Sequence, residues 1–149
     1  LADGIDEVGR GHGHQIAKDK VDMLTMLFGA ALGTAPTEAE DRRARQRDAV
    51  EQWIGRNLLA EDLSPGRIAA EHFMSTRTLH SLFAEVGTTV GEVVRGHRLA
   101  LAGELLMRHP GLPVAEVARR AGFADPSYFA RSFRRRFGCA PSRFRDGGC

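Results

Sequence analysis

The sequence predicts an all-α fold in which a unit of two short helices occurs twice. A long helix is expected between the copies, and an amphipathic helix before them. Three observations support this prediction. Apolar residues recur at helical spacing, capping residues and glycines mark where helices begin and end, and one such pattern returns about fifty residues later in the chain.

The composition is that of a globular protein. A chain of 149 residues suits one compact domain with an extra segment, or two small units that share a core. No stretch approaches the roughly 18 uninterrupted apolar residues of a membrane span, and the beginning of the chain lacks the order of a signal peptide. We therefore expect a cytoplasmic location and no membrane partner.

The net charge of +2 is unevenly distributed. Residues 51–149 contain 14 arginines, no lysine and 10 acidic residues, a net charge of +4, whereas residues 1–50 carry a net charge of −2. Arginine is the side chain best suited to binding phosphate and guanine with two parallel hydrogen bonds. The imbalance favours an anionic partner for the second part of the chain, although solvated arginine faces are common.

Catalytic and metal-binding patterns are not found. The only cysteines, Cys139 and Cys149, cannot build a disulfide framework or a four-cysteine zinc site, so we expect free thiols, with Cys139 in apolar packing and not reactive. His12 and His14 lack a third ligand at a recognisable spacing. No nucleophile elbow or phosphate-binding glycine loop is present. The sequence therefore predicts no catalytic residue, no metal, no cofactor and no enzymatic activity.

The first part of the chain is expected to form two helices. Apolar residues at helical spacing predict an amphipathic helix over 15–32, after a glycine-rich start. Thr37 followed by Glu40 is a capping-box signature for a second helix, whose basic run at 42–47 we interpret as a solvated face. The apolar side of this helix holds Val50, Trp53, Ile54 and Leu58. The expected division is an N-terminal segment over 1–36 and a second domain over 37–149.

The first two-helix unit is expected over about 63–87. Ser64 with Pro65 begins one short helix, and Ser75 begins the next after a turn at Phe73. The second helix should end by Gly87, with a buried face made of Leu79, Leu82, Phe83 and Val86. Two short helices joined by a tight turn are typical of a helix-turn-helix subdomain.

The long linker helix is expected over about 90–108, where the His-Pro-Gly-Leu-Pro stretch at 109–113 ends it. A second helix-turn-helix subdomain should then occupy about 113–138. Its turn lies at Gly122, Asp125 and Pro126 begin its second helix, and Phe129 and Phe133 take the places of Leu79 and Phe83 in the first unit.

The second helix of each unit has a polar outer face. In the first unit the helical step places Arg77, His80 and Ser81 opposite the apolar residues. Such a face suits insertion into the DNA major groove, which is about 12 Å wide.

The corresponding face in the second unit is richer in arginine. Arg131 lies in the middle of this helix and is the best candidate for reading a base. Arg134 and Arg135 lie nearer its end and are candidates for phosphate contacts. Ser127 also points outward, Tyr128 lies at the border of the face, and Arg136 is expected near the edge of the core.

These residues resemble a known family. Residues from about 49 to 145 are similar to the C-terminal DNA-binding domain of AraC/XylS-type transcription regulators. The resemblance runs through 75–83, STRTLHSLF, and is most specific over 122–138, GFADPSYFARSFRRRFG, and over 140–145, APSRFR. The chain departs from the family at Phe73, where many members have glycine, and at Pro126, which lacks a polar side chain that some members use there.

The resemblance implies a sequence-specific transcription regulator, expected to be an activator, that binds two adjacent major-groove segments of double-stranded DNA about one helical turn apart. It assigns major-groove contacts to Arg77, His80, Ser81, Ser127, Tyr128 and Arg131. RNA polymerase is an implied partner. Members usually carry a further N-terminal effector or dimerisation domain, so this chain is either a fragment or lacks the sensor. We expect a fragment, in which 1–36 is the end of a truncated sensor domain and a homodimer can form through the missing or truncated N-terminal region. The alternative is a protein-interaction module of the same fold that docks on RNA polymerase or another regulator without reading bases.

Overall fold

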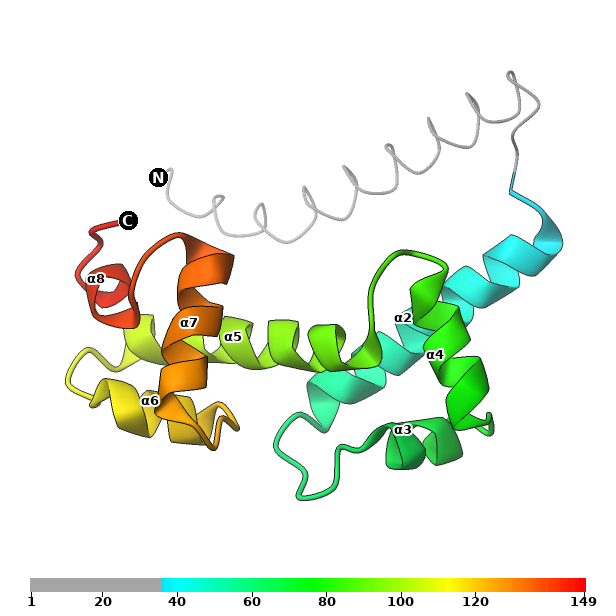
Figure 1. Ribbon diagram of the computed structural model, residues 1–149, viewed down its shortest axis with the longest axis horizontal. Helices are drawn as coiled ribbons and strands as arrows, with labels where there is room; N and C mark the ends of the chain where they lie inside the picture. Colours follow the sequence, from blue (N-terminus) through cyan, green and yellow to red (C-terminus); the bar gives the residue numbers. More distant parts are fainter. Residues whose placement is uncertain (1–35) are drawn as a thin grey trace, which may run out of the picture. The chain divides into compact units, whose positions relative to one another are not determined.

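The computed structural model describes residues 36–149, and this part of the chain forms α-helices α2 to α8 and no strands (Figure 1). The chain divides into two compact units, residues 1–43 and 44–149. The expected helix over 15–32 and the pair His12 and His14 lie outside the described residues. Among the described helices, none is long and apolar enough to cross a membrane.

Helix α2 runs from Glu38 to Arg56 and begins as the capping-box signature predicts. The Thr37 amide donates to the Glu40 carboxylate at 2.6 Å, and the Glu40 amide donates to the Thr37 hydroxyl at 3.2 Å. Arg47 differs from the expected solvated face, because it is largely buried and forms an ion pair with Glu85 at 3.7 Å. This pair joins α2 to the residue that follows α4.

The first helix-turn-helix subdomain consists of α3, Pro65–Glu71, and α4, Thr76–Ala84. Ser64 and Ser75 are the N-caps, as predicted, and the Ser75 hydroxyl accepts a hydrogen bond of 3.0 Å from the Thr78 amide. The prediction for Val86 was wrong. Helix α4 ends before it, and its side chain is 53% exposed in the turn that leads to α5.

Helix α5, Val90–Arg108, has the predicted range and joins the two subdomains (Figure 1). Thr89 and Glu92 form a second capping box, with the two amide-to-side-chain bonds at 2.9 and 3.2 Å. Such reciprocal bonds satisfy two amides that have no partner within the helix. Figure 1 shows α3 and α4 at one end of α5 and α6 to α8 at the other.

The second subdomain consists of α6, Val114–Arg120, and α7, Pro126–Phe137, followed by α8, Pro141–Arg145. Asp125 is the N-cap of α7, and the left-handed Gly138 ends it. Helix α8 was not predicted from the sequence. Its Phe144 packs against the rings of Phe133 and Phe137, with ring centroids 5.3 and 4.9 Å away.

Each subdomain has its own hydrophobic core. The two cores share α5, because Val90 near its beginning belongs to the first and Leu106 near its end to the second. Buried residues of the first core are Val50, Ile54, Leu58, Ile68, Ala69, Leu79, Phe83 and Val90. Those of the second are Leu99, Ala102, Leu106, Val117, Ala118, Ala121, Phe123, Phe129 and Phe133.

The turns of the two subdomains have the same hydrogen bond. The Met74 amide donates to Ala69 at 3.0 Å, and the Phe123 amide donates to Ala118 at 2.9 Å. The residue before each donor is left-handed: Phe73 has φ 54° and Gly122 has φ 87°. Phe73 therefore has the left-handed backbone conformation that glycine has in the second turn, although residues with a side chain rarely adopt it.

The expectation of two free thiols was wrong. Cys139 and Cys149 form a disulfide across α8, with Cα atoms 6.0 Å apart. The chain folds back after α8, because the amides of Gly147 and Gly148 donate to carbonyls inside that helix. This reversal brings the two cysteines together, and Cys139 therefore does not pack as an isolated apolar thiol.

Candidate nucleic-acid interface

The outer face of α4 is polar and exposed, as predicted. Arg77, His80 and Ser81 are exposed, whereas Leu79, Leu82 and Phe83 on the other side of the helix are buried. Burial of three apolar residues fixes the rotation of α4 about its axis, so the helix presents this face to solvent in a defined orientation.

The outer face of α7 is likewise exposed. Burial of Phe129 and Phe133 fixes the rotation of this helix, with the two ring centroids 5.5 Å apart. The five predicted site residues of this helix all belong to its exposed side: Ser127, Tyr128, Arg131, Arg134 and Arg135. Arg136 is also exposed, and its guanidinium lies 5.7 Å from the centroid of the Phe137 ring.

Three arginines on these faces are free to meet an external partner. In residues 36–149, the guanidinium groups of Arg77, Arg131 and Arg134 form no hydrogen bond or ion pair. Other exposed arginines do have partners, for example Arg67, which pairs with Glu71 at 2.7 Å. An unpaired guanidinium has no partner to give up when it binds a phosphate or a guanine.

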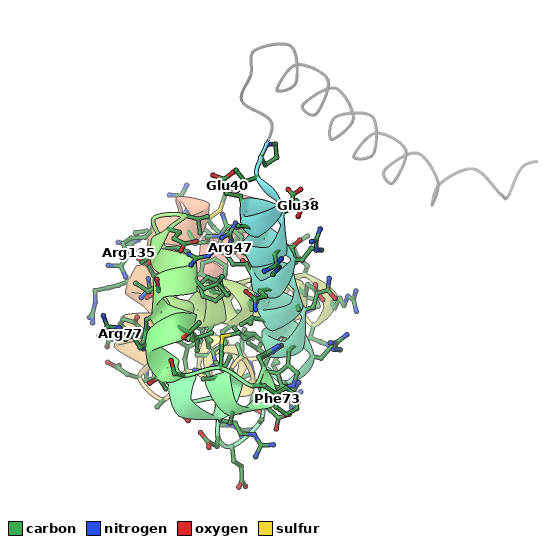
Figure 2. The ribbon with its side chains drawn as sticks, turned by 90° about the vertical axis from the view of Figure 1, so that its right-hand side faces the viewer. Glu38, Glu40, Arg47, Phe73, Arg77 and Arg135 are labelled. Carbon is green, nitrogen blue, oxygen red and sulfur yellow. A yellow bond between two sulfur atoms is a disulfide. The ribbon has the colours of Figure 1, made fainter. Side chains whose placement is uncertain are left out.

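The two outer faces share one side of the second unit. Figure 2 shows that Arg77 of α4 and Arg135 of α7 point to the same side, while Arg47 of α2 lies elsewhere. Because α5 holds both subdomains, its length sets their separation. At 1.5 Å per residue its 19 residues span about 28 Å, which is close to the pitch of about 34 Å that separates successive major-groove segments.

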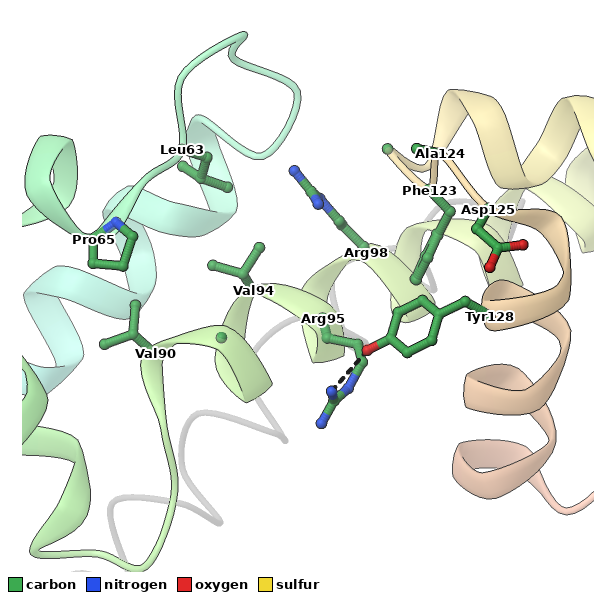
Figure 3. Close-up of a pocket in the computed structure, with 12 residues that line it drawn as sticks. Leu63, Pro65, Val90, Val94, Arg95, Arg98, Phe123, Ala124, Asp125 and Tyr128 are labelled. Atoms are coloured by element: carbon green, nitrogen blue, oxygen red, sulfur yellow. Dashed lines mark hydrogen bonds between the residues drawn. The ribbon is translucent and has the colours of Figure 1, made fainter.

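Tyr128 is held by the linker helix. The Arg95 guanidinium donates a hydrogen bond of 2.9 Å to the Tyr128 hydroxyl (Figure 3). This hydrogen bond lowers the pKa of Tyr128, since a nearby cation favours the phenolate. Arg95 also lies 3.8 Å from Glu92 in the capping box of α5. Arg95 was not among the site residues predicted from the sequence, because its partner is 33 residues away and no local pattern indicates the contact.

Further along α7, Arg135 donates to the hydroxyl of Ser132 at 3.3 Å. Ser132 is a polar residue, yet it is buried, with 2% of its surface exposed. This bond holds the guanidinium group of Arg135 against its own helix, while the residue stays exposed.

The family comparison matches the region just described. A family model described as "Helix-turn-helix domain" matches residues 68–147, which is more than half of the chain. Among curated proteins, the transcriptional activator NphR of a Rhodococcus species is 35% identical over 145 residues. The HTH-type transcriptional regulator ExsA of Pseudomonas aeruginosa is 38% identical over 143 residues. These alignments cover 97% and 91% of the chain but 43% and 49% of the relatives, so the chain spans less than half the length of each.

Solved structures agree with this match. A DNA-binding transcriptional dual regulator from Escherichia coli K-12 has a TM-score of 0.63 at 28% identity, covering 68% of this chain and 96% of that one. A probable AraC family transcriptional regulator from Rhodopseudomonas palustris CGA009 also has a TM-score of 0.63, at 26% identity, and covers 72% of this chain and 97% of that one. The similarity therefore includes both subdomains and the linker helix.

Proposed function

Because this chain belongs to the AraC/XylS-type family of helix-turn-helix transcription regulators, we propose that it binds specific double-stranded DNA sites and activates transcription from them. Helix α4 enters one major-groove segment and α7 enters the next. The observation that carries the proposal is the set of unpaired, exposed arginines on the outer faces of two capped helices whose rotation is fixed by buried phenylalanines.

The residues divide into two roles. Arg77, His80 and Ser81 on α4, with Ser127, Tyr128 and Arg131 on α7, meet base edges in the groove. An arginine that lies mid-helix can donate two parallel hydrogen bonds to guanine O6 and N7. Arg134 and Arg135, near the end of α7, bind phosphates and so fix the register of the protein on the duplex without selecting a sequence.

The proposal includes the partner proteins and the location of this regulator. The relative NphR is a transcriptional activator, and activation brings the bound protein into contact with RNA polymerase. The protein acts in the cytoplasm by binding and not by catalysing a reaction. Dimerisation through a region outside the described residues would place two such domains on neighbouring DNA sites.

Duplex binding at several salt concentrations tests this function. A preferred site is first selected from a random pool of duplexes, and its affinity is then compared with that of an unrelated duplex and of heparin. We expect a clear preference for the selected site and a steep fall of log affinity with log salt, with a slope of about −0.9 per phosphate neutralised. Equal affinity for all three polyanions, or a flat salt response, would favour a protein-docking module that reads no bases.

A further inference from the structure

A cavity of about 490 Å³ lies beside the linker helix α5. None of the residues that line it is a predicted DNA contact. Its walls come from both subdomains, because Leu58 and Leu59 follow α2 while Arg119 and Arg120 end α6. Pockets of roughly 300–1,000 Å³ are typical of small-molecule sites. The position and size of this cavity suit a ligand that contacts both subdomains at once.

One wall of the cavity is apolar. Leu101 and Leu105 of α5 are half-buried there, and Leu58 is buried beside them. Leu59 is 63% exposed, and it is one of the few large apolar side chains at the surface of the described residues. Covering these leucines would remove apolar surface from water, which favours binding of a hydrocarbon group.

The lining of the cavity also carries an excess of positive charge. Arg119 and Arg120 share a single carboxylate: their guanidinium groups donate to Glu116 at 2.7 and 2.9 Å and at 2.8 Å, respectively. One negative charge therefore meets two positive ones. Both arginine side chains remain more than half exposed, so each keeps N–H donors that an anion can reach.

Arg98 of α5 adds a third cation with no partner. Its guanidinium forms no hydrogen bond or ion pair in the described part of the chain, and its Nε is buried without a hydrogen bond. The side chain passes close to the turn before α7, where a Cβ at Gly122 would lie only 2.8 Å from Nε. The terminal nitrogens of this guanidinium also have no partner in the described residues, so they can donate to an acceptor in the cavity.

Arg98 also lines a neighbouring cavity of about 440 Å³, in which it lies between Val94 and Phe123 (Figure 3). That cavity is less suited to an anion. Its other arginine, Arg95, already donates to Tyr128, and Asp125 contributes a negative charge. The uncompensated positive charge therefore belongs to the cavity beside Leu59 and Arg119.

We propose that the cavity lined by Leu59, Arg98 and Arg119 binds a small amphipathic monoanion, a carboxylate with a hydrocarbon tail. The carboxylate accepts hydrogen bonds from Arg98 and from Arg119 or Arg120, and the tail covers the leucines. No residue of α4 or α7 lines this cavity. Binding of the anion therefore does not require DNA, and its affinity can be measured on the protein alone.

The test is isothermal titration calorimetry of the whole chain with octanoate, and with 1-octanol as a neutral probe with the same tail. We expect saturable octanoate binding, and binding of 1-octanol that is at least about tenfold weaker, because a charge-assisted hydrogen bond is lost. Arg98→Gln should weaken octanoate binding by a similar factor. Arg108→Gln is the matched control, since it removes the same charge from α5 at a residue that pairs with Glu104 and does not line the cavity.

Arg98 also packs beside Gly122, so Arg98→Gln could affect folding as well as ligand binding. A second variant that changes only exposed side chains separates the two effects. The double variant Arg119→Gln/Arg120→Gln changes two exposed side chains, and it should also weaken octanoate binding about tenfold or more. Absence of saturable octanoate binding to the unaltered chain would overturn the proposal. Equal affinity for octanoate and 1-octanol, or equal weakening by Arg108→Gln and Arg98→Gln, would overturn it as well.

Discussion

Phe73 and Gly122 occupy the same place in the two helix-turn-helix subdomains, and both are left-handed, with φ of 54° and 87°. In each case the next amide donates back to the first helix of its unit. Phe73 gains no packing in return for this conformation, because its side chain is 99% exposed. The first turn therefore contains local strain that the second turn lacks.

Phe73→Gly should accordingly raise the free energy of unfolding by about 0.5–1.5 kcal/mol. The left-handed conformation costs an L-residue about 1–2 kcal/mol, from which the greater flexibility of glycine in the unfolded chain subtracts a part. Gly122→Ala is the reciprocal variant and should lower the free energy of unfolding by at least about 1–2 kcal/mol, because its Cβ would also lie 2.8 Å from Arg98 Nε. Urea denaturation measures both. A destabilised Phe73→Gly variant would mean that the Phe73 ring makes a contact that stabilises the fold.

The hydrogen bond from Arg95 to Tyr128 should couple the linker helix to α7. A double-mutant cycle with Arg95→Gln and Tyr128→Phe, measured by urea denaturation, should give a coupling energy of about 0.5–1 kcal/mol, because both side chains are partly exposed to solvent. Arg134→Gln with Tyr128→Phe provides a control cycle, since Arg134 has no bond to Tyr128. Additive effects in the first cycle would show that the bond contributes nothing to stability in solution.

The stability of the second subdomain should depend on pH through Glu116. Hydrogen bonds from Arg119 and then Arg120 lower the pKa of this carboxyl from its ordinary value of 4.5 to about 2. A carboxyl with a lowered pKa in the folded state stabilises the fold above its unfolded pKa and loses this contribution as the pH falls through the folded value. The contribution should therefore be present above about pH 4.5 and disappear toward about pH 2.

Thermal denaturation of the unaltered chain and of Glu116→Gln from pH 7 to pH 2 checks this expectation. The melting temperatures of the two should differ most at neutral pH and converge as the pH approaches 2. A constant difference over the whole range would indicate that Glu116 contributes by packing and not by its charge.

Much of the fold follows from signals that act within a few residues. Ser75 and Asp125 cap their helices where the sequence predicts, because an N-cap needs only a side-chain oxygen and an amide two or three residues away. The rotation of α7 follows as well, since Phe129 and Phe133 are one turn apart and must both be buried.

The features that were not predicted depend on packing, on chain reversal or on where a helix ends. Helix α8 has only five residues and is held by the contact of Phe144 with Phe133, which a short local pattern does not reveal. The pairing of Cys139 with Cys149 depends on the chain reversal after α8. Val86 was placed on a buried face because the apolar spacing continues through it, whereas the helix ends two residues earlier.

The division of roles on α7 is the most specific part of the proposed function. Arg131 is unpaired and lies mid-helix, whereas Arg135 lies near the end of α7 and is tethered to Ser132. Arg131→Ala should weaken binding to the selected site by about 1–3 kcal/mol and relax the preference at one base pair, while leaving nonspecific affinity nearly unchanged. Arg135→Ala should weaken binding to all duplexes alike and reduce the salt slope by about one.

The decisive measurement is a titration of Arg131→Ala against the selected site, each of its single-base variants and an unrelated duplex, with Arg108→Ala as a control that removes the same charge from α5. We predict that Arg131→Ala loses affinity for the selected site and discriminates less at one base pair, and that Arg108→Ala binds DNA like the unaltered chain. A loss by the same factor on every duplex would contradict it, because Arg131 would then bind a phosphate and α7 would hold the DNA without reading it.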